Sequence, residues 1–349
     1  MTTVNRFTAA RKKLTRWFKR VIKDNLLLAL HYVGYPLVLG VNAWLRRRKL
    51  FVLYRLHGSA IGDTVVMTGV VRCIAEDLGC RVIVYVKQND DIFLHNPHVL
   101  FCRSYEKMNR LEKTLIKSGL DILHGSHIAK YHPQMRDLEG YLLSHREHSI
   151  VTNSRHIPGL QYRTLRTEIA FDDDELERLG RALALPTAYA VVKPTGKTSV
   201  TTKKEWGLEN FQAVIDAFPD VAWVQPGAPD EPLLEGVIDL RGKTNLRELF
   251  YLIANARFTL TIEGLYNHIA GAFTNPSFVV YSGHFFPEAF DYDNTIAIIQ
   301  NGLPSCSPCF ADGSRDCPIP GKPCMSELTP EFAIDTIRKT LEPHALKEA

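Results

Sequence analysis

Short apolar runs alternate with longer stretches of helical periodicity along most of the chain. The apolar runs predict strands at residues 51–56, 81–86, 99–102, 121–124, 189–193, 222–225, 258–262 and 277–281. The periodic stretches predict helices at residues 64–78, 175–184, 208–217, 246–255 and 269–273. Short, wholly apolar strands that alternate with helices are typical of parallel sheets. The pattern therefore predicts an α/β fold built from βαβ units.

The length of the chain predicts two domains. Its 349 residues are 45% hydrophobic and 23% charged, an ordinary globular composition, and a domain has about 150 residues. Residues 151–171 lack strong periodicity and separate two groups of strands and helices. We therefore expect an N-terminal domain at residues 50–170 and a C-terminal domain at residues 171–349, preceded by an extension at residues 1–49.

An acidic run, Asp172-Asp173-Asp174-Glu175, stands at this boundary. An Asp-x-Asp cluster can hold a divalent metal and a nucleotide diphosphate. Acidic residues in the first turn of a helix also complement the partial positive charge of its N-terminus. Because an apparent helix follows at once, we interpret the run as a helix start and not as a metal site.

The charge of the chain is unevenly distributed. Residues 1–49 contain twelve Lys and Arg residues and one acidic residue, a formal charge of +11. The remaining 300 residues have 30 Lys and Arg against 37 Asp and Glu, a formal charge of −7. A mildly acidic body argues against an enzyme that binds nucleic acid in a broad basic groove. The basic extension favours an anionic partner surface, with a membrane as the first candidate.

The extension has two parts. Residues 11–23 place Leu, Trp, Phe and Val at helical spacing between basic residues, which predicts a basic amphipathic helix. Residues 26–45 form an apolar stretch just long enough to span a bilayer, although His, Gly, Pro and Asn interrupt it. Three interpretations stay open: an interfacial membrane anchor, which we favour, a membrane span, or a helix packed on the protein itself. A signal peptide is not expected, because no small-residue cleavage site follows the stretch.

One loop at the end of a predicted strand has the features of a ligand site. The residues concerned follow strand 51–56 and are His57, Gly58, Ser59, Gly62 and Asp63. Parallel sheets bind ligands at the carboxyl ends of their strands, and glycine lets the backbone approach a ligand closely. Asp63 is either a helix cap or a carboxylate that takes a proton in a ligand cleft. The loop lacks the Gly-x-Gly-x-x-Gly fingerprint of dinucleotide binding.

A second loop of this kind follows strand 189–193. It begins with Thr195 and Gly196 after a proline, and it offers several hydroxyl groups and three lysines that include Lys204. A diphosphate requires hydrogen-bond donors and positive charge near a helix N-terminus. We interpret the loop as a diphosphate site, with an ordinary solvated basic loop as the alternative.

A third loop follows strand 258–262. Glu263 and Gly264 stand between that strand and the next helix, which contains His268. A carboxylate at this place can bind sugar or ribose hydroxyls, and two units with such loops suggest a cleft between them. Three other histidines, His124, His127 and His132, are interpreted as ordinary loop residues rather than metal ligands, although they can still contact an acceptor.

Seven cysteines give two further indications. Three of them are scattered through the first half of the chain, unlike the even framework of a secreted disulfide protein, so we expect a reducing, cytoplasmic compartment. The other four lie within nineteen residues, in a Gly- and Pro-rich loop at 302–325: Cys306, Cys309, Cys317 and Cys324. Four thiolates suit one tetrahedral ion, so we interpret the loop as a structural Zn or Fe site, with free thiols or disulfides as the alternative.

Several motifs resemble one known family in their order and spacing. They are LHGSAIGDTVVMTGVVRCI at 56–74, Lys-x-Trp at 204–206, LRGKTNLRELFYLIANARFTLTIEG at 240–264, the helix with His268, CSPC at 306–309 with two later cysteines, and MSELTPEFAIDTIRK at 325–339. Between residues 50 and about 340, the chain resembles glycosyltransferase family nine, the ADP-heptose:lipopolysaccharide heptosyltransferases. The resemblance implies a GT-B fold, in which two Rossmann-like domains face each other across a cleft.

The resemblance also implies roles for individual residues. The first domain would bind the acceptor, with Asp63 at the position of the family's proposed general base. The second would bind the nucleotide-sugar, with Thr195 and Gly196 in the phosphate loop and with Lys204 and His268 near the diphosphate. Such enzymes typically invert the anomeric centre without a catalytic metal. This chain has Glu263-Gly264-Leu265 where many members have Asp-Ser/Thr-Gly, and its extension is absent from typical members.

The resemblance thus predicts an enzyme that transfers a heptose or similar sugar from an ADP-sugar to a lipopolysaccharide core acceptor. It would work at the cytoplasmic face of the inner membrane, held there by its basic extension. Two alternatives stay open. Relatives that modify autotransporter proteins carry a Cys-bound metal finger, so the acceptor can also be a protein. A non-catalytic, membrane-bound subunit that binds nucleotide-sugars is the other alternative, which an intact Asp63 and Lys204 argue against.

Overall fold

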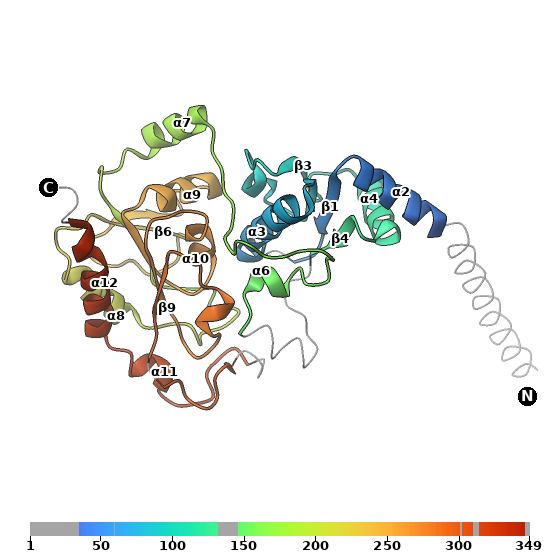
Figure 1. The fold of residues 1–349 in the computed structure, drawn as a ribbon. Coiled ribbons are helices and arrows are strands. Elements are labelled where there is room, and N and C mark those ends of the chain that lie inside the picture. The colour runs from blue at the N-terminus through green and yellow to red at the C-terminus, as the bar shows by residue number, and fades with distance from the viewer. Residues whose placement is uncertain (1–34, 59, 132–145, 301, 310–313, 346–349) are drawn as a thin grey trace, which may run out of the picture.

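The computed structural model describes residues 35–345 apart from Ser59 and residues 132–145, 301 and 310–313. The chain forms two α/β units, each built around a parallel sheet (Figure 1). The predicted α/β class is therefore confirmed. The basic amphipathic helix predicted at residues 11–23 and the apolar residues 26–34 lie outside the described residues.

The first sheet has four strands in the order β3-β2-β1-β4, and every neighbouring pair is parallel. The elements of this unit are α2 (Tyr35–Arg47), β1 (Leu50–Arg55), α3 (Ile61–Leu78), β2 (Arg81–Val86), η2 (Asp90–Phe93), β3 (Val99–Ser104), α4 (Arg110–Leu123), β4 (Ile128–Lys130) and α6 (Ser149–Thr152). The strand order reverses between β1 and β4, because β2 and β3 extend the sheet to one side of β1 and β4 to the other. The loop that follows β1 therefore stands at the point where such sheets bind ligands.

The second sheet has six parallel strands in the order β10-β9-β8-β5-β6-β7. Its strands are β5 (Ala190–Lys193), β6 (Trp223–Gly227), β7 (Ile238–Arg241), β8 (Phe258–Ile262), β9 (Ser277–Val280) and β10 (Thr295–Ile298). Its helices are α7 (Asp173–Leu183), α8 (Leu208–Asp216), α9 (Leu246–Asn255), α10 (Leu265–Ala270), η3 (Pro287–Ala289), α11 (Pro323–Ser326) and α12 (Pro330–Ala345). This strand order is that of a Rossmann sheet, and it reverses between β5 and β8.

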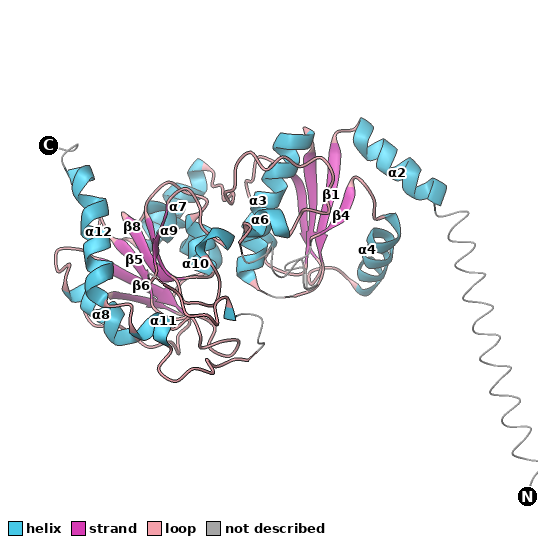
Figure 2. Ribbon diagram, turned by 60° about the horizontal axis from the view of Figure 1, so that its bottom comes forward, coloured by secondary structure: helices cyan, strands magenta, loops and turns pink. Residues whose placement is uncertain are grey.

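Helices cover both faces of each sheet. In the first unit, α3 and α6 lie on one face of the sheet, and α2 and α4 lie on the other (Figure 2). In the second unit, α8 and α12 cover one face of the sheet, and α9 and α10 cover the other. The strands are short and apolar because both of their faces are covered, and β5 and β8 are buried at every position.

The two units share one continuous apolar core. The cluster that surrounds α3 also includes buried side chains of α9 and α10 in the second unit, and helices α3 and α10 pack against each other. A segment at 166–168 ties both units together. The hydroxyl of Thr167 donates a hydrogen bond to the backbone carbonyl of His268 over 2.7 Å, and the backbone N–H of Glu168 donates a hydrogen bond to the hydroxyl of Thr68 over 2.8 Å. The shared apolar core and the direct hydrogen bonds therefore hold the two sheets in place relative to each other.

The acidic run at the boundary forms a helix start, as predicted. Asp172 accepts the backbone N–H of Glu175 over 2.8 Å and caps α7, whose first turn contains the other acidic residues. Glu175 itself is buried and forms a two-pronged ion pair with Arg247 of α9, at 2.9 and 2.5 Å. The run therefore stabilises a helix and its packing.

One strand prediction was wrong. Residues 121–123 belong to the last turn of α4, and the neighbouring strand is β4, a few residues later. A capping box at the start of α4, in which Asn109 and Glu112 bond each other's backbone N–H groups, sets up a helix long enough to include the apolar run. The helix predicted at 269–273 lies earlier, at Leu265–Ala270, so residues 271–273 of the prediction are not helical. Strands β7 and β10 were not predicted.

The end of the predicted apolar stretch is packed on the first unit. Asn42 of α2 is buried, accepts the backbone N–H of His127 over 2.7 Å and donates to the carbonyl of Leu123 over 3.3 Å. Leu45 of α2 is buried in a small core with residues of β1, α4 and β4. Among the described residues, no helix is long and apolar enough to cross a membrane.

Candidate active site between the two sheets

The loop after β1 carries Asp63 into the first turn of α3. The N-cap position of α3 is occupied by Ala60, which makes no side-chain cap, and Asp63 lies inside the helix. Asp63 is therefore not the helix cap that the sequence offered as one interpretation. Its carboxylate oxygen Oδ2 instead accepts a hydrogen bond from the guanidinium of Arg55, over 2.8 Å, and 37% of the Asp63 side chain is exposed. Asp63 is therefore held from one side and open on another.

Arg55 is the last residue of β1, and its side chain is buried. Besides Asp63, it donates to the carbonyl of Ala60 over 3.1 Å and to the hydroxyl of Thr64 over 2.8 Å. Gly58 closes over the guanidinium with a left-handed φ of 77°, and a Cβ at that position would lie 3.0 Å from it. Arg55 thus fixes both the loop and the Asp63 carboxylate.

Burial raises the pKa of Asp63, and the nearby carboxylate of Glu263 adds to this effect. The cations Arg55 and Lys204 act in the opposite direction. A carboxylate with a raised pKa is a better proton acceptor than an exposed aspartate. The electrostatic coupling also means that Asp63 of the first unit lies near Lys204 and Glu263 of the second.

In the second unit, Lys204 and Glu263 form a mostly buried ion pair. The ammonium group of Lys204 also lies 5.2 Å from the ring centre of Phe285, a cation–π distance. Glu263 follows β8 directly, and Gly264 allows the sharp turn into α10 with a φ of 154°. The ion pair places one cation and one carboxylate beside the carboxyl end of β8.

His268 of α10 is buried, and its Nδ1 atom lies 2.9 Å from the hydroxyl of Tyr292. Burial lowers the pKa of His268 to about 3, with a further contribution from Lys204, so its ring is neutral at physiological pH. The other edge of the ring faces the first unit, because a Cβ at Gly62 would lie 3.2 Å from its Cδ2 atom. His268 and Asp63 therefore approach the same boundary from opposite units.

Strand β5 lies beside β8, so the loop that follows it emerges at the same edge of the sheet. Thr195 in this loop is buried, and among the described residues its hydroxyl has no hydrogen-bond partner. The backbone N–H of Gly196 donates to the carboxylate of Glu205 over 2.9 Å. The N–H of Gly196, in the predicted phosphate loop, is thus bonded to a side chain of the same loop.

The remaining acceptor-side predictions lie at the surface. His57 and Gly58 are exposed, whereas Ser59 lies outside the described residues. Of the three loop histidines, His127 bonds the hydroxyl of Ser126 through Nδ1 over 3.1 Å, and His132 is not described. His124 ends α4.

The Cys-rich loop packs against the loop that carries Lys204. The carbonyl of Cys309 accepts from the ammonium of Lys203 over 3.1 Å, and Lys322 donates to the carbonyl of Thr202 over 2.9 Å. Cys309 also lies near His284, with 3.8 Å between its sulfur and the imidazole Nδ1. The Cys-rich loop therefore contacts the two residues that precede Lys204.

Thiolates are suitable donors for the predicted Zn or Fe. Burial raises the pKa of Cys324, with contributions from the nearby Cys317 and Cys306. In the part of the chain that the structure describes, however, no three Cys, His or acidic side chains are arranged to hold one ion. Residues 310–313, between two of the cysteines, are not described. A structural metal therefore stays a prediction.

Three residues of the site were not predicted: Arg55, Phe285 and Tyr292. The sequence could have predicted a role for Arg55, because a charged residue that ends an otherwise apolar strand requires a buried partner. Phe285 and Tyr292 come from a loop without periodicity and reach the site only through the tertiary fold.

Two Rossmann-like sheets whose strand-end loops meet at one boundary define the GT-B class of fold, which is the fold of many glycosyltransferases. The chain belongs to glycosyltransferase family 9, the heptosyltransferases, whose family model matches residues 116–318. It is therefore a glycosyltransferase, as the sequence motifs predicted. No curated protein matches the chain.

Several solved structures are similar to this one. A family 9 glycosyltransferase from Veillonella parvula DSM 2008 has 14% identity and a TM-score of 0.61, over 84% of this chain and 96% of that one. The ADP-heptose lipopolysaccharide heptosyltransferase II of E. coli has 12% identity and a TM-score of 0.60, over 86% and 100%. The iron-containing dodecameric glycosyltransferase TibC of enterotoxigenic E. coli H10407 has 14% identity and a TM-score of 0.58, over 83% and 75%. At such identities the likeness shows the fold.

Proposed function

We propose that the protein transfers a heptose from an ADP-sugar to a lipopolysaccharide core acceptor at the cytoplasmic face of the inner membrane. The observation that carries this proposal is the convergence of Asp63 from the first unit with Lys204, Glu263 and His268 from the second. A sugar transferase needs a proton acceptor on the side of the incoming hydroxyl and positive charge on the side of the leaving diphosphate.

In the proposed reaction, Asp63 removes the proton of an acceptor hydroxyl while the hydroxyl oxygen attacks the anomeric carbon of the donor. The bond from that carbon to the diphosphate oxygen breaks, and the anomeric centre inverts. Negative charge then develops on the diphosphate, where Lys204 can neutralise it. Neutral His268 can donate a hydrogen bond without adding charge, if Tyr292 donates to its Nδ1 and leaves the proton on Nε2. Asp63 stays protonated until the proton passes to solvent.

The choice of donor follows the structural neighbours. One of them is TibC in complex with ADP-D-β-D-heptose, with a TM-score of 0.57 to this chain. Thermal-shift measurements with ADP, UDP and GDP sugars test the choice, because a ligand that binds the native state raises its apparent stability. We expect a rise with ADP-sugars alone. A rise with UDP- or GDP-sugars but not ADP-sugars would exclude ADP-heptose as the donor.

Asp63→Asn tests the proposed base. We expect loss of at least about a hundredfold in kcat, the usual contribution of a general base, with unchanged donor binding. Asp220→Asn is the matched control, because Asp220 is exposed and precedes β6, at the amino edge of the sheet away from the site. Full activity of a folded Asp63→Asn variant would exclude Asp63 as the base. Donor binding without transfer or hydrolysis in the wild-type protein would favour a non-catalytic binding subunit.

A protein acceptor is the second candidate, and the four cysteines near the donor loop favour it, because the family resemblance links a Cys-bound metal finger to relatives that modify autotransporter proteins. Labelled ADP-heptose incubated with a core glycolipid and with an autotransporter fragment separates the two acceptors. We also propose that Cys306, Cys309, Cys317 and Cys324 hold a structural Zn or Fe ion. Elemental analysis of the purified protein should find about one ion per chain, and replacement of Cys324 by serine should remove it.

Residues 1–49 are proposed to attach the enzyme to the membrane. Because α2 packs on the first unit, the appropriate truncation removes residues 1–34 and keeps Asn42 and Leu45 in place. We expect the truncated protein to lose most of its membrane binding and to retain its donor binding. If it still sediments fully with membranes, the removed segment is not the anchor.

A further inference from the structure

Two helices that cover the same face of the first sheet expose apolar side chains to solvent. Helix α2 exposes Leu37 and Trp44, seven residues apart and more than half accessible. Helix α4 exposes Leu111 and Leu115 by more than 60% each, and Ile122 by 47%. Spacings of four and seven residues place these side chains on one face of each helix. We call these five residues the α2–α4 apolar face.

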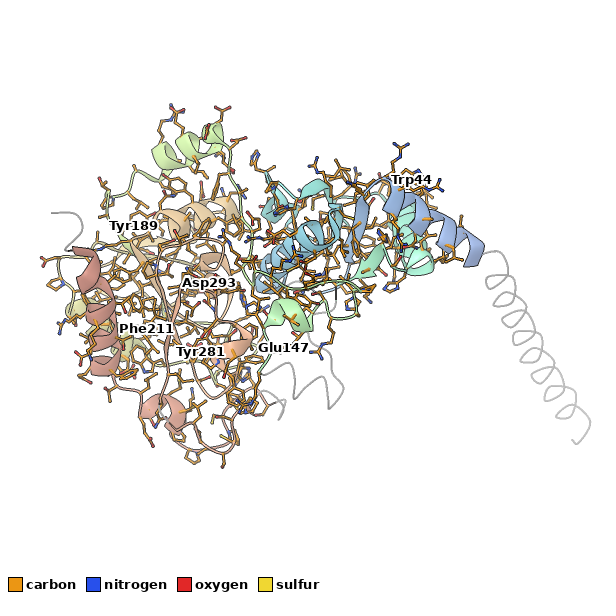
Figure 3. All side chains as sticks on the ribbon, in the orientation of Figure 1. Trp44, Glu147, Tyr189, Phe211, Tyr281 and Asp293 are labelled. Atoms are coloured by element: carbon orange, nitrogen blue, oxygen red, sulfur yellow. The ribbon has the colours of Figure 1, made fainter. Side chains whose placement is uncertain are left out.

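The two helices form one rigid surface. They pack against each other, and both bury their inner sides against the same face of the first sheet, in a core that includes Leu45 and Leu120. Asn42 joins α2 to the end of α4 through the carbonyl of Leu123. Both helices cover one face of this sheet (Figure 2). Figure 3 places Trp44 at the end of the molecule far from the second unit.

Basic residues border this apolar face. Exposed Arg46, Arg47 and Arg48 follow Trp44 at the end of α2, and exposed Arg110 and Lys117 lie on α4. The acidic residue in the first turn of α4, Glu112, is engaged in the capping box and in an ion pair with Arg103 at 3.0 Å. Apolar side chains bordered by cations are complementary to the interface of an anionic bilayer, where apolar groups enter the acyl boundary and cations meet phosphates.

The opposite side of the same sheet carries the candidate active site. Helix α3, with Asp63 in its first turn, covers the face opposite α2 and α4 (Figure 2). Contact through α2 and α4 therefore leaves the boundary between the two units uncovered.

We infer that the α2–α4 apolar face and its bordering cations dock directly onto an anionic lipid bilayer, so that the folded acceptor unit, and not only the extension, contacts the membrane. This inference rests on the proposed membrane attachment and adds a second contact to it. The proposed partner is a bilayer surface that contains anionic phospholipid.

Cosedimentation of the full chain with vesicles tests the inference. The vesicles contain phosphatidylcholine alone or an equal mixture with phosphatidylglycerol. The test variant is Leu111→Ser/Leu115→Ser, and the control is Leu233→Ser/Phe332→Ser, two apolar residues of the second unit that are exposed by 46% and 44%. We expect the test variant to bind the mixed vesicles about tenfold more weakly or worse, since immersion of even half of two leucines is worth that factor. The control should bind like the wild type.

A second variant addresses charge. Arg46→Gln/Arg47→Gln/Arg48→Gln removes three cations, each of which contributes about fivefold near an anionic surface, so binding to mixed vesicles should fall strongly. Its binding to pure phosphatidylcholine should hardly change. In the full chain, brominated lipids should also quench the fluorescence of Trp44. The total tryptophan quenching should therefore be weaker in Trp44→Phe than in the wild type. Circular dichroism of every variant shows that the fold is intact.

The outcomes separate the two membrane proposals. If the wild type binds mixed vesicles and the leucine variant binds equally well, the extension is the whole anchor and the inference about the folded unit is wrong. If the wild type binds neither kind of vesicle, the proposed membrane attachment fails with it. If the leucine variant instead changes the oligomeric state in light scattering, the face is an interface between copies, which also overturns the inference.

Discussion

Replacement of Arg55 by methionine gives the sharpest test of how the site prepares Asp63. The guanidinium lies 2.8 Å from the Asp63 carboxylate and favours its charged form, so it holds the pKa of Asp63 below the value that burial alone would produce. Removal of Arg55 should therefore raise the pKa of Asp63. A base with a higher pKa loses activity at a higher pH, so the acid limb of the pH–rate profile should move upward.

The size of the shift follows from the geometry. Two unit charges about 4 Å apart interact by about 4 kcal/mol at an effective dielectric constant of about 20. Because 37% of the Asp63 side chain is exposed, solvent screening reduces this energy, and we expect about 1.4 kcal/mol, or one pKa unit. The acid limb should therefore move up by about one pH unit. Loss of the bonds from Arg55 to Ala60 and Thr64 should also lower stability by about 1–3 kcal/mol.

The assay is the pH dependence of kcat/KM, which reports the pKa of the free enzyme. Measurements below the melting temperature of the variant remove the effect of stability. Arg55→Lys is the control, because it keeps the charge and should move the limb by less. An unchanged acid limb in a folded Arg55→Met protein would refute the reasoning, since either Asp63 is not the titrating base or Arg55 does not act on it.

Three further predictions address the buried groups and the Cys-rich loop. Tyr292→Phe removes the partner of His268 Nδ1 and should lower kcat by about fivefold to tenfold with a small change in donor affinity; an equal loss in both would point to a purely structural role. Burial raises the pKa of Asp291 to about 6, so its ionisation destabilises the fold as the pH rises from about 4 to 6. Asp291→Asn should therefore stabilise the protein by about 1 kcal/mol at pH ~8 and by nothing at pH ~3.5, measured by denaturant unfolding, and equal effects at both would contradict the assignment. Because the carbonyl of Cys309 accepts from Lys203, removal of a bound ion by a chelator should lower both the melting temperature and the donor affinity, and unchanged affinity would show that the two loops are independent.

Much of the fold follows from local pattern. Strands such as β5 and β8 are short and wholly apolar, so their buried, parallel character is visible in the sequence. The strand predicted at 121–124 failed because a short apolar run has the same composition in a strand and in the last turn of a helix. Periodicity also says nothing about strand order, which places the loops after β5 and β8 side by side.

The candidate site residues could be picked from the sequence because they stand near strand ends. Asp63 lies in the first turn of α3, Lys204 in the loop after β5 and Glu263 directly after β8, and the resemblance assigned them to one cleft. Their partners were not accessible to this reasoning, because Phe285 and Tyr292 reach the site through contacts between distant segments. The ion pair of Lys204 with Glu263 is likewise a property of the folded protein.

These internal contacts determine what donor binding must change. Lys204 is paired with Glu263, and the N–H of Gly196 is bonded to Glu205, so both groups that would meet a diphosphate already have partners. A diphosphate has to compete with two carboxylates of the same chain, and it can do so because it brings more negative charge and more acceptor oxygens. If Lys204 turned to the diphosphate, as the proposed reaction requires, Glu263 would lose its cation and could accept hydrogen bonds from the sugar hydroxyls. The contact between Lys204 and Glu263 thus pairs the two charges without a donor, and the same two residues would bind its diphosphate and its sugar.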